Sequence, residues 1–314
     1  MIESMFMVGQ RTVPWAKVGV SVEGAVSSRE AIEKAGLNWK VEPRKIFIDG
    51  VDGEAKEYVA NVRSKDNKVL GVVSKRYKIV QNEDAFAFTD ELLANDVKFE
   101  AAGAFADGKK VWLLARMPDF KLVGDDMKNY LVFTNTHNGT GSVRVCVTPV
   151  RVVCNNVLNL AFRSASRAWS ARHIGENPVE RIHEAQSALD LTQAYIKGLD
   201  AEATRLAMLK VTPEQIEKAL KVSVPQIRKA YLPDATQAAL ERAEIIRGDF
   251  MRCYNSPDLD NFRGTAWGAV NAMSDFITHG APGRNSKKFD ENRCSKIFDG
   301  HADFDNFVKF FKAA

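Results

Sequence analysis

Short stretches of alternating apolar and polar residues dominate the first half of the chain. This period of two is typical of β-strands with one buried face. Pairs of such stretches flank polar turns, and two of the turns contain the dipeptides Asp107-Gly108 and Asn138-Gly139, which are strong hairpin signals. The pattern predicts three antiparallel hairpins, formed by residues 58–63 with 69–73, 99–105 with 111–117, and 130–135 with 142–148.

Two short helices are predicted beside these hairpins. Ser27 and Glu30 have the spacing of a capping box, and Gly36 ends that helix. Asn82 is predicted to cap a second helix over residues 83–93. Together with the hairpins, they indicate an antiparallel sheet with a few helices on it.

Beyond residue 154 the apolar period lengthens to that of an α-helix. We expect a helix to begin at Asn155 or Asn156, one long amphipathic helix or a pair of helices over 179–210, and a further helix over 265–276. Thr212 and Pro213 mark another helix start. Residues 280–300 are polar and predict a loop, and a last aromatic helix is expected near 304–311. The predicted fold is α+β, with an antiparallel region at residues 1–154 and a helical region at residues 155–314.

The distribution of charge is more informative than its sum. The chain has 314 residues, 44 of them Lys or Arg and 40 Asp or Glu, so its net charge is only +4. Between Asp126 and Glu176, however, there is no acidic residue. That interval contains a set of basic residues, Lys128, Arg144, Arg151, Arg163, Arg167 and Arg172. A patch of one sign attracts polyanions; alternatively, these side chains pair with acids elsewhere in the fold.

Strand alternation over 142–148 would place Val143 and Val145 on a buried face and Arg144 on the other. The next helix would begin at the Asn pair, where free backbone N–H groups suit a phosphate. We therefore predict a nucleic-acid interface formed by Arg144, Arg151, Asn155, Asn156, Arg163 and Arg167. For Arg151 the alternative is burial against a carboxylate. Trp169 either stacks on a base or packs in the core.

Signatures of common enzymes were sought and not found. The chain has no phosphate-binding Gly-Lys-Ser/Thr loop, no dinucleotide-binding Gly-x-Gly-x-x-Gly after a strand, and no nucleophile elbow or zinc helix motif. His137 with Cys146 and Cys154 leaves open a zinc site or a Cys–His nucleophile pair. No metal or cofactor is otherwise indicated, and we expect a binding protein rather than an enzyme.

The sequence also indicates the cellular compartment. No run of apolar residues is long enough to span a membrane, and the N-terminus lacks the features of a secretion signal. The four cysteines are therefore expected to be reduced thiols without a disulfide, in a cytoplasm.

Several motifs resemble a known family. They are Pro14-Trp15, residues 72–86, the turn His137-Asn-Gly139, Thr148-Pro-Val-Arg-Val-Val-Cys-Asn-Asn156, and Thr265-Ala-Trp267 with Asn271-Ala272. They resemble the phage/plasmid-like family, a domain of unknown function (number 932) of phages, prophages and plasmids, over most of residues 1–280. The resemblance implies a setting of mobile DNA in the cytoplasm of a bacterial host, without defining a reaction.

These observations favour a protein of phage DNA metabolism or recombination that binds or anneals single-stranded DNA. The predicted order of hairpins and helices is also compatible with the single-strand annealing proteins of phages, which oligomerise and hold DNA in a basic groove. A homo-oligomer is thus a second expectation. The alternative is a host-interaction or anti-defence protein that acts through protein contacts, which would expose an apolar patch instead of a basic groove.

Overall fold

The structure is a computed structural model. It describes residues 13–87, 89–92, 98–152, 157, 168–175, 187–280 and 288–312. The predicted boundary at residues 154 and 155 lies outside this part of the chain, as do Asn155, Asn156, Arg163 and Arg167.

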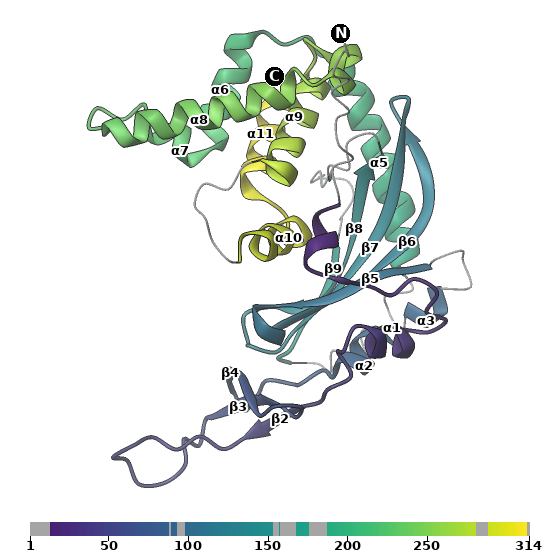
Figure 1. The fold of residues 1–314 in the computed structure, drawn as a ribbon, viewed down its shortest axis with the longest axis vertical. Coiled ribbons are helices and arrows are strands. Elements are labelled where there is room, and N and C mark those ends of the chain that lie inside the picture. The colour runs from purple at the N-terminus through teal and green to yellow at the C-terminus, as the bar shows by residue number, and fades with distance from the viewer. Residues whose placement is uncertain are drawn as a thin grey trace, which may run out of the picture.

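A sheet of antiparallel strands forms the centre of the molecule (Figure 1). Its order is β1-β5-β6-β7-β8-β9. The strands are β1 (Val20–Ser21), β5 (Lys98–Phe105), β6 (Lys110–Leu122), β7 (Asp125–Thr136), β8 (Ser142–Arg151) and β9 (Ala168–Arg172). The Asp107-Gly108 and Asn138-Gly139 turns lie at the same end of this sheet, because each joins neighbouring strands that leave that end.

A smaller sheet, which we call the arm, projects from this end (Figure 1). It consists of β2 (Val41–Arg44), β3 (Tyr58–Arg63) and β4 (Lys68–Ser74), all antiparallel. Gly71 of β4 packs directly on the β7–β8 turn, since a Cβ there would lie 2.5 Å from the Cα of Asn138. The arm therefore docks partly through close backbone contact, and the buried Leu70 and the Arg63 guanidinium, which donates to the Asp107 carbonyl oxygen, add side-chain contacts.

Helices pack on the sheet, and several of those beyond residue 210 form the opposite end of the molecule (Figure 1). The α-helices are α1 (Ser28–Lys34), α2 (Asn82–Phe86), α3 (Thr89–Leu92), α5 (Ser187–Met208), α6 (Pro213–Ser223), α7 (Pro225–Lys229), α8 (Gln237–Tyr254), α9 (Ala266–His279), α10 (Phe289–Asp299) and α11 (Ala302–Lys312). Short 3-10 helices are η1 (Pro14–Lys17), η3 (Ala106–Gly108) and η5 (Pro257–Phe262).

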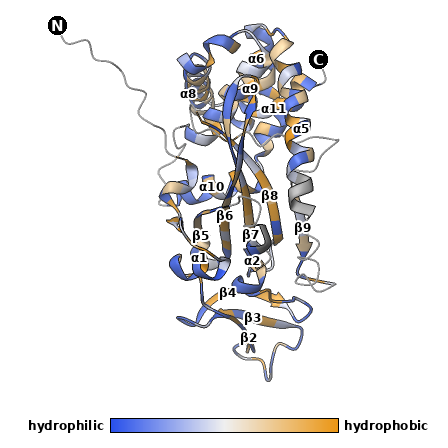
Figure 2. Cartoon of the chain, turned by 90° about the vertical axis from the view of Figure 1, so that its right-hand side faces the viewer, coloured by the Kyte–Doolittle hydropathy of each residue, from blue (hydrophilic) through white to orange (hydrophobic). Residues whose placement is uncertain are grey.

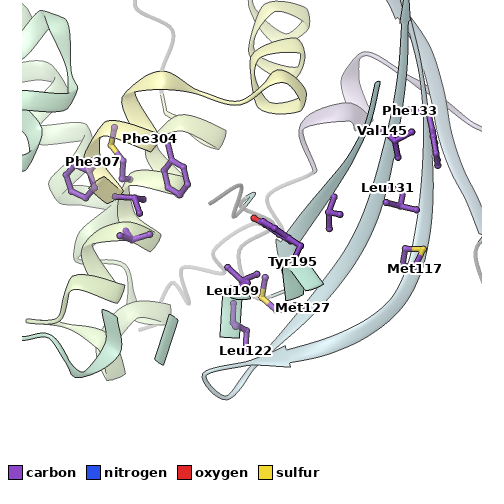
Figure 3. Packing of buried hydrophobic residues seen from close by; sticks show 14 of the residues in the cluster. Met117, Leu122, Met127, Leu131, Phe133, Val145, Tyr195, Leu199, Phe304 and Phe307 are labelled. Atoms are coloured by element: carbon purple, nitrogen blue, oxygen red, sulfur yellow. The ribbon is translucent and has the colours of Figure 1, made fainter. Parts of the chain in front are cut away.

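Both faces of the central sheet are covered. On one face, Leu131 and Val145 join Tyr195 and Leu199 of α5 in a large hydrophobic cluster (Figure 3). On the other, Trp112 and its neighbours pack against residues of η1 and α10, in a cluster of Trp15, Ala101, Phe105, Trp112, Leu114, Tyr130, Val132, Cys146, Val150, Val157, Cys294, Ile297 and Phe298. We call these the α5 face and the α10 face.

The predicted fold class is confirmed. The three hairpins are present, the second half of the described chain is helical, and Thr212 and Thr265 cap helices as the sequence indicates. Trp169 packs against the cluster of the α5 face, as in its core interpretation.

Some local predictions were wrong. Residues 289–299 are helix α10, not loop. Asn82 is the first residue of α2 rather than its cap, and its side chain donates to the Leu37 carbonyl oxygen. β6 continues through Pro118 by means of a bulge, which extends the β6–β7 hairpin beyond the predicted strand. Among the described residues, no helix is long and apolar enough to cross a membrane.

Candidate nucleic-acid interface

Arg151 lies inside the fold. Its side chain is only 1% exposed, and its guanidinium contacts two carboxylates, with Nε 2.7 Å from Asp125 Oδ2 and Nη1 2.6 Å from Asp258 Oδ2. A further bond, 2.8 Å long, runs from Nη2 to the Asp258 carbonyl oxygen. Arg151 thus follows the alternative interpretation, burial against acids, and we remove it from the set of phosphate contacts.

Asp258 lies beside Arg151 because the C-terminal helices pack against the end of β8. Asp258 lies on η5, and η5 leads into α9, whose first turn is capped by the Thr265 hydroxyl, 3.1 Å from the Gly268 N–H. Further along α9, the Ser274 hydroxyl donates to the Val157 carbonyl oxygen at 2.7 Å. Arg151 and Val157 therefore contact η5 and α9, and these contacts join the two halves of the molecule.

Arg144 occupies a different environment. Strand pairing opposes Arg144 to Ser170, and Ser142 to Arg172. Directly paired residues share a face, and so do residues two apart. The same register puts Lys110 and Thr134 on this face, which is the α10 face. Arg144 is 25% exposed on its side chain, and Arg172 and Ser170 are exposed.

Lys110, Thr134 and Arg144 line a cleft of about 390 Å³ between the hairpin turns and α10. Its lining includes the cations Lys109, Lys110 and Arg144, together with the hydroxyls of Thr134, Thr136, Thr140, Ser142 and Ser295. We call this surface, with Arg172 beside it, the cationic end of the sheet. It combines positive charge with hydrogen-bond donors, which is what a phosphate group requires.

The acids of the cleft lining come from α10. Asp299 Oδ1 is 2.6 Å from Lys110 Nζ, and the Asp299 carbonyl oxygen accepts from Arg144 Nη1 at 3.0 Å. Glu291, the other acid of the cleft lining, accepts from the Ala106 backbone N–H. Lys109 and Arg172 have no ion pair among the described residues, so the surface keeps a net positive charge.

His137 and Cys146 do not form a site together. His137 Nε2 is 2.9 Å from Asn82 Oδ1, and because the Asn82 amide nitrogen donates elsewhere, His137 is the donor. Cys146 is buried on the α10 face and its thiol donates to the Phe298 carbonyl oxygen at 3.4 Å. A Cys–His pair between these residues is therefore wrong, while Cys154 lies outside the described residues.

The described part of the chain contains no group of three or more His, Cys, Asp or Glu side chains placed to hold a metal ion. Cys146, Cys253 and Cys294 are buried and take part in no disulfide among the described residues. The expectation that all four cysteines are reduced stays a prediction, because Cys154 lies outside the described residues.

Burial of His137 makes the stability of the fold sensitive to pH. Burial, with a smaller effect of nearby His173, lowers the pKa of His137 to about 3, whereas an unfolded chain has a His pKa of about 6.5. Below pH 6.5 the unfolded state binds a proton that the folded state excludes, so stability falls as pH decreases. Wild type should lose about 1 kcal/mol more than His137→Asn between about pH 7 and 5.5. Denaturant unfolding at both pH values measures this, and equal losses would contradict it.

Comparison with known proteins gives one match. A family model described as "Domain of unknown function (DUF932)" matches residues 69–297. No curated protein and no solved structure matches the chain. The matched range includes the β7–β8 turn, and it also includes Arg151, η5 and α9, which the structure brings together.

Proposed function

Since the chain belongs to the DUF932 family, whose description assigns no activity, we propose its function from the site itself: it binds single-stranded nucleic acid through the cationic end of the sheet. The observation that carries this proposal is the gathering of Lys109, Lys110, Arg144 and Arg172 at one end of one sheet face.

The chemistry of the surface supports this proposal. Nucleic-acid affinity depends mainly on Lys and Arg contacts to phosphates, and hydroxyl groups add hydrogen bonds to the backbone. The described strands contribute hydroxyls and cations to this end, and the acids of the cleft lining belong to α10. The four cations of this surface allow contacts with about two to four phosphates, which suits a flexible single strand that follows the cleft.

Within this proposal the chain acts as a binding or annealing protein of phage or plasmid DNA metabolism, in the cytoplasm of a bacterial host, and functions as a homo-oligomer. Arg144 remains from the set predicted from the sequence. Lys109, Lys110 and Arg172 replace Arg151. Asn155, Asn156, Arg163 and Arg167 stay candidates, and Arg167 directly precedes β9 in the chain.

Changing Arg172 to Ala should weaken binding of labelled oligothymidylate, measured by fluorescence anisotropy. Loss of one phosphate contact lowers the magnitude of the log–log salt slope by about 0.7 for single strands. The folded state should keep its stability, because Arg172 is exposed and has no ion pair among the described residues. The matched control is Lys197→Ala: Lys197 is exposed on α5, which covers the other face of the sheet. Equal effects of the two changes would contradict the proposal.

A second candidate function rests on the arm. Its surface exposes large apolar side chains, namely Phe47, Ile48, Val51, Tyr58, Val69 and Val72, and Figure 2 shows hydrophobic residues along its strands. Exposed apolar groups gathered on a projecting element are typical of protein contacts. If wild type fails to bind the oligonucleotide at low salt, this alternative, an interaction protein, is favoured.

A further inference from the structure

A second cavity lies beside α10. It has a volume of about 350 Å³, which is in the range of pockets that hold small ligands. Its wall is formed by the start of α7, by α8, α9 and α10, and by the first residues of α11. The side chains that matter for its chemistry are Arg242, Phe276, Phe289, Arg293, Lys296 and Asp303. Asn292 of α10 lines both this cavity and the cleft at the cationic end, so α10 separates the two.

Cations outnumber acids around this cavity. Arg293 is half-buried and donates to the carbonyl oxygens of Thr278, at 3.1 Å, and of Gly280. No ion pair of Arg242, Arg293 or Lys296 occurs among the described residues. A buried or half-buried cation without a carboxylate is unfavourable unless an anion balances it. The arrangement therefore leaves positive charge for a ligand to neutralise.

The lining contains the carboxylate of Asp303 and the three cations Arg242, Arg293 and Lys296. Burial raises the pKa of Asp303 and lowers that of His301 beside it. Both shifts act against the charged forms of these two groups. With three cations and one carboxylate, the lining keeps a net positive charge that an external anion can neutralise.

The other side of the cavity is apolar and partly aromatic. Phe276 and Phe289 line it together with Ile246. The Phe289 ring already holds one flat cation, since the Arg293 guanidinium lies 4.1 Å from its centroid. Aromatic rings and guanidinium planes are the surfaces on which nucleobases stack.

From this combination we propose that the cavity binds a mononucleotide, with its phosphate near Lys296 and Arg242 and its base against the phenylalanines. This site is distinct from the cationic end of the sheet and does not depend on the function proposed for it. The class of ligand follows from the chemistry of the lining: a phosphate for the cations and a flat ring for the apolar wall.

Isothermal titration calorimetry of the full chain with thymidine 5′-monophosphate tests the proposal. We expect saturable binding, and at least about tenfold weaker binding both of thymidine, which lacks the anion, and of inorganic phosphate, which lacks the base. Absence of nucleotide binding at millimolar concentration, or equal affinity for thymidine, overturns the proposal.

Variants locate the site. Lys296→Ala should weaken nucleotide binding about tenfold, the size of one lost charge-assisted contact, without loss of folding, because Lys296 is exposed. Lys309→Ala is the matched control: Lys309 is exposed on α11 and does not line the cavity. Arg172→Ala, at the other surface, should leave nucleotide affinity unchanged. An unaltered affinity in Lys296→Ala, or an equal loss in either other variant, places the nucleotide elsewhere and overturns the assignment.

Discussion

Replacing Arg151 by Ala is expected to destabilise the fold by about 3–5 kcal/mol, the cost of breaking a buried ion pair. The variant leaves Asp125 and Asp258 without the cation that lies 2.7 and 2.6 Å from them. It also detaches the end of β8 from η5, so the sheet loses a link to the helical half. Chemical unfolding, with the transition followed by circular dichroism, measures the loss.

Arg144→Ala provides the matched control on the same strand. Arg144 is 25% exposed, and its Nη1 is 3.8 Å from the Asp299 carboxylate, a partly solvated pair. Such pairs contribute about 0–1 kcal/mol, so this variant should remain close to wild type in stability. If Arg151→Ala were as stable as Arg144→Ala, the buried role of Arg151 would be wrong.

The second large effect concerns a glycine in the first turns of α9. A Cβ on Gly268 would clash with the Phe262 carbonyl oxygen and lie 2.9 Å from its carbonyl carbon. Phe262 ends η5, which carries Asp258, and its backbone cannot withdraw like a flexible side chain. Gly268→Ala is therefore expected to destabilise the fold by about 1–3 kcal/mol, as overpacking does. Thermal or denaturant unfolding gives the value.

Gly248→Ala is the opposite case and the control. Gly248 lies within α8, and a Cβ there meets no atom within 4 Å. Replacing a helical Gly by Ala stabilises by up to about 1 kcal/mol when space allows. The two identical substitutions should thus have effects of opposite sign. The same sign in both would refute the close contact between α9 and η5.

Local sequence signals predicted much of the fold because the turns carry their own chemistry. Asp107 and Gly108 both adopt positive φ, at 59° and 97°, and Asn138-Gly139 places Gly139 at 80°. These dipeptides tolerate such angles and so position the hairpins. Helix α10 was not predicted because it has few apolar residues and these pack on strands far away in the sequence. Cys294, Ile297 and Phe298 form its buried side, which lies against the α10 face of the sheet.

The candidate site was only partly predictable. The acid-free interval contains Arg144 and Arg172 as well as Arg151, but sequence cannot distinguish an exposed arginine from a buried one. The partners of Arg151 are 26 and 107 residues away in the chain. Likewise, Lys109 and Lys110 come from another hairpin, and only the strand register places Lys110 on the same face as Arg144. Contacts between residues far apart in the sequence thus determine which cations remain available to bind phosphate.

The most direct test of the proposed nucleic-acid binding is the salt dependence of wild-type affinity for single-stranded oligothymidylate between about 50 and 200 mM salt. Two to four phosphate contacts at the cationic end predict a log–log slope of roughly −1.5 to −3, which decreases in magnitude when Arg144 and Arg172 are both changed to Ala. Absence of binding at the lowest salt, or a slope that the double variant leaves unchanged, would contradict the account.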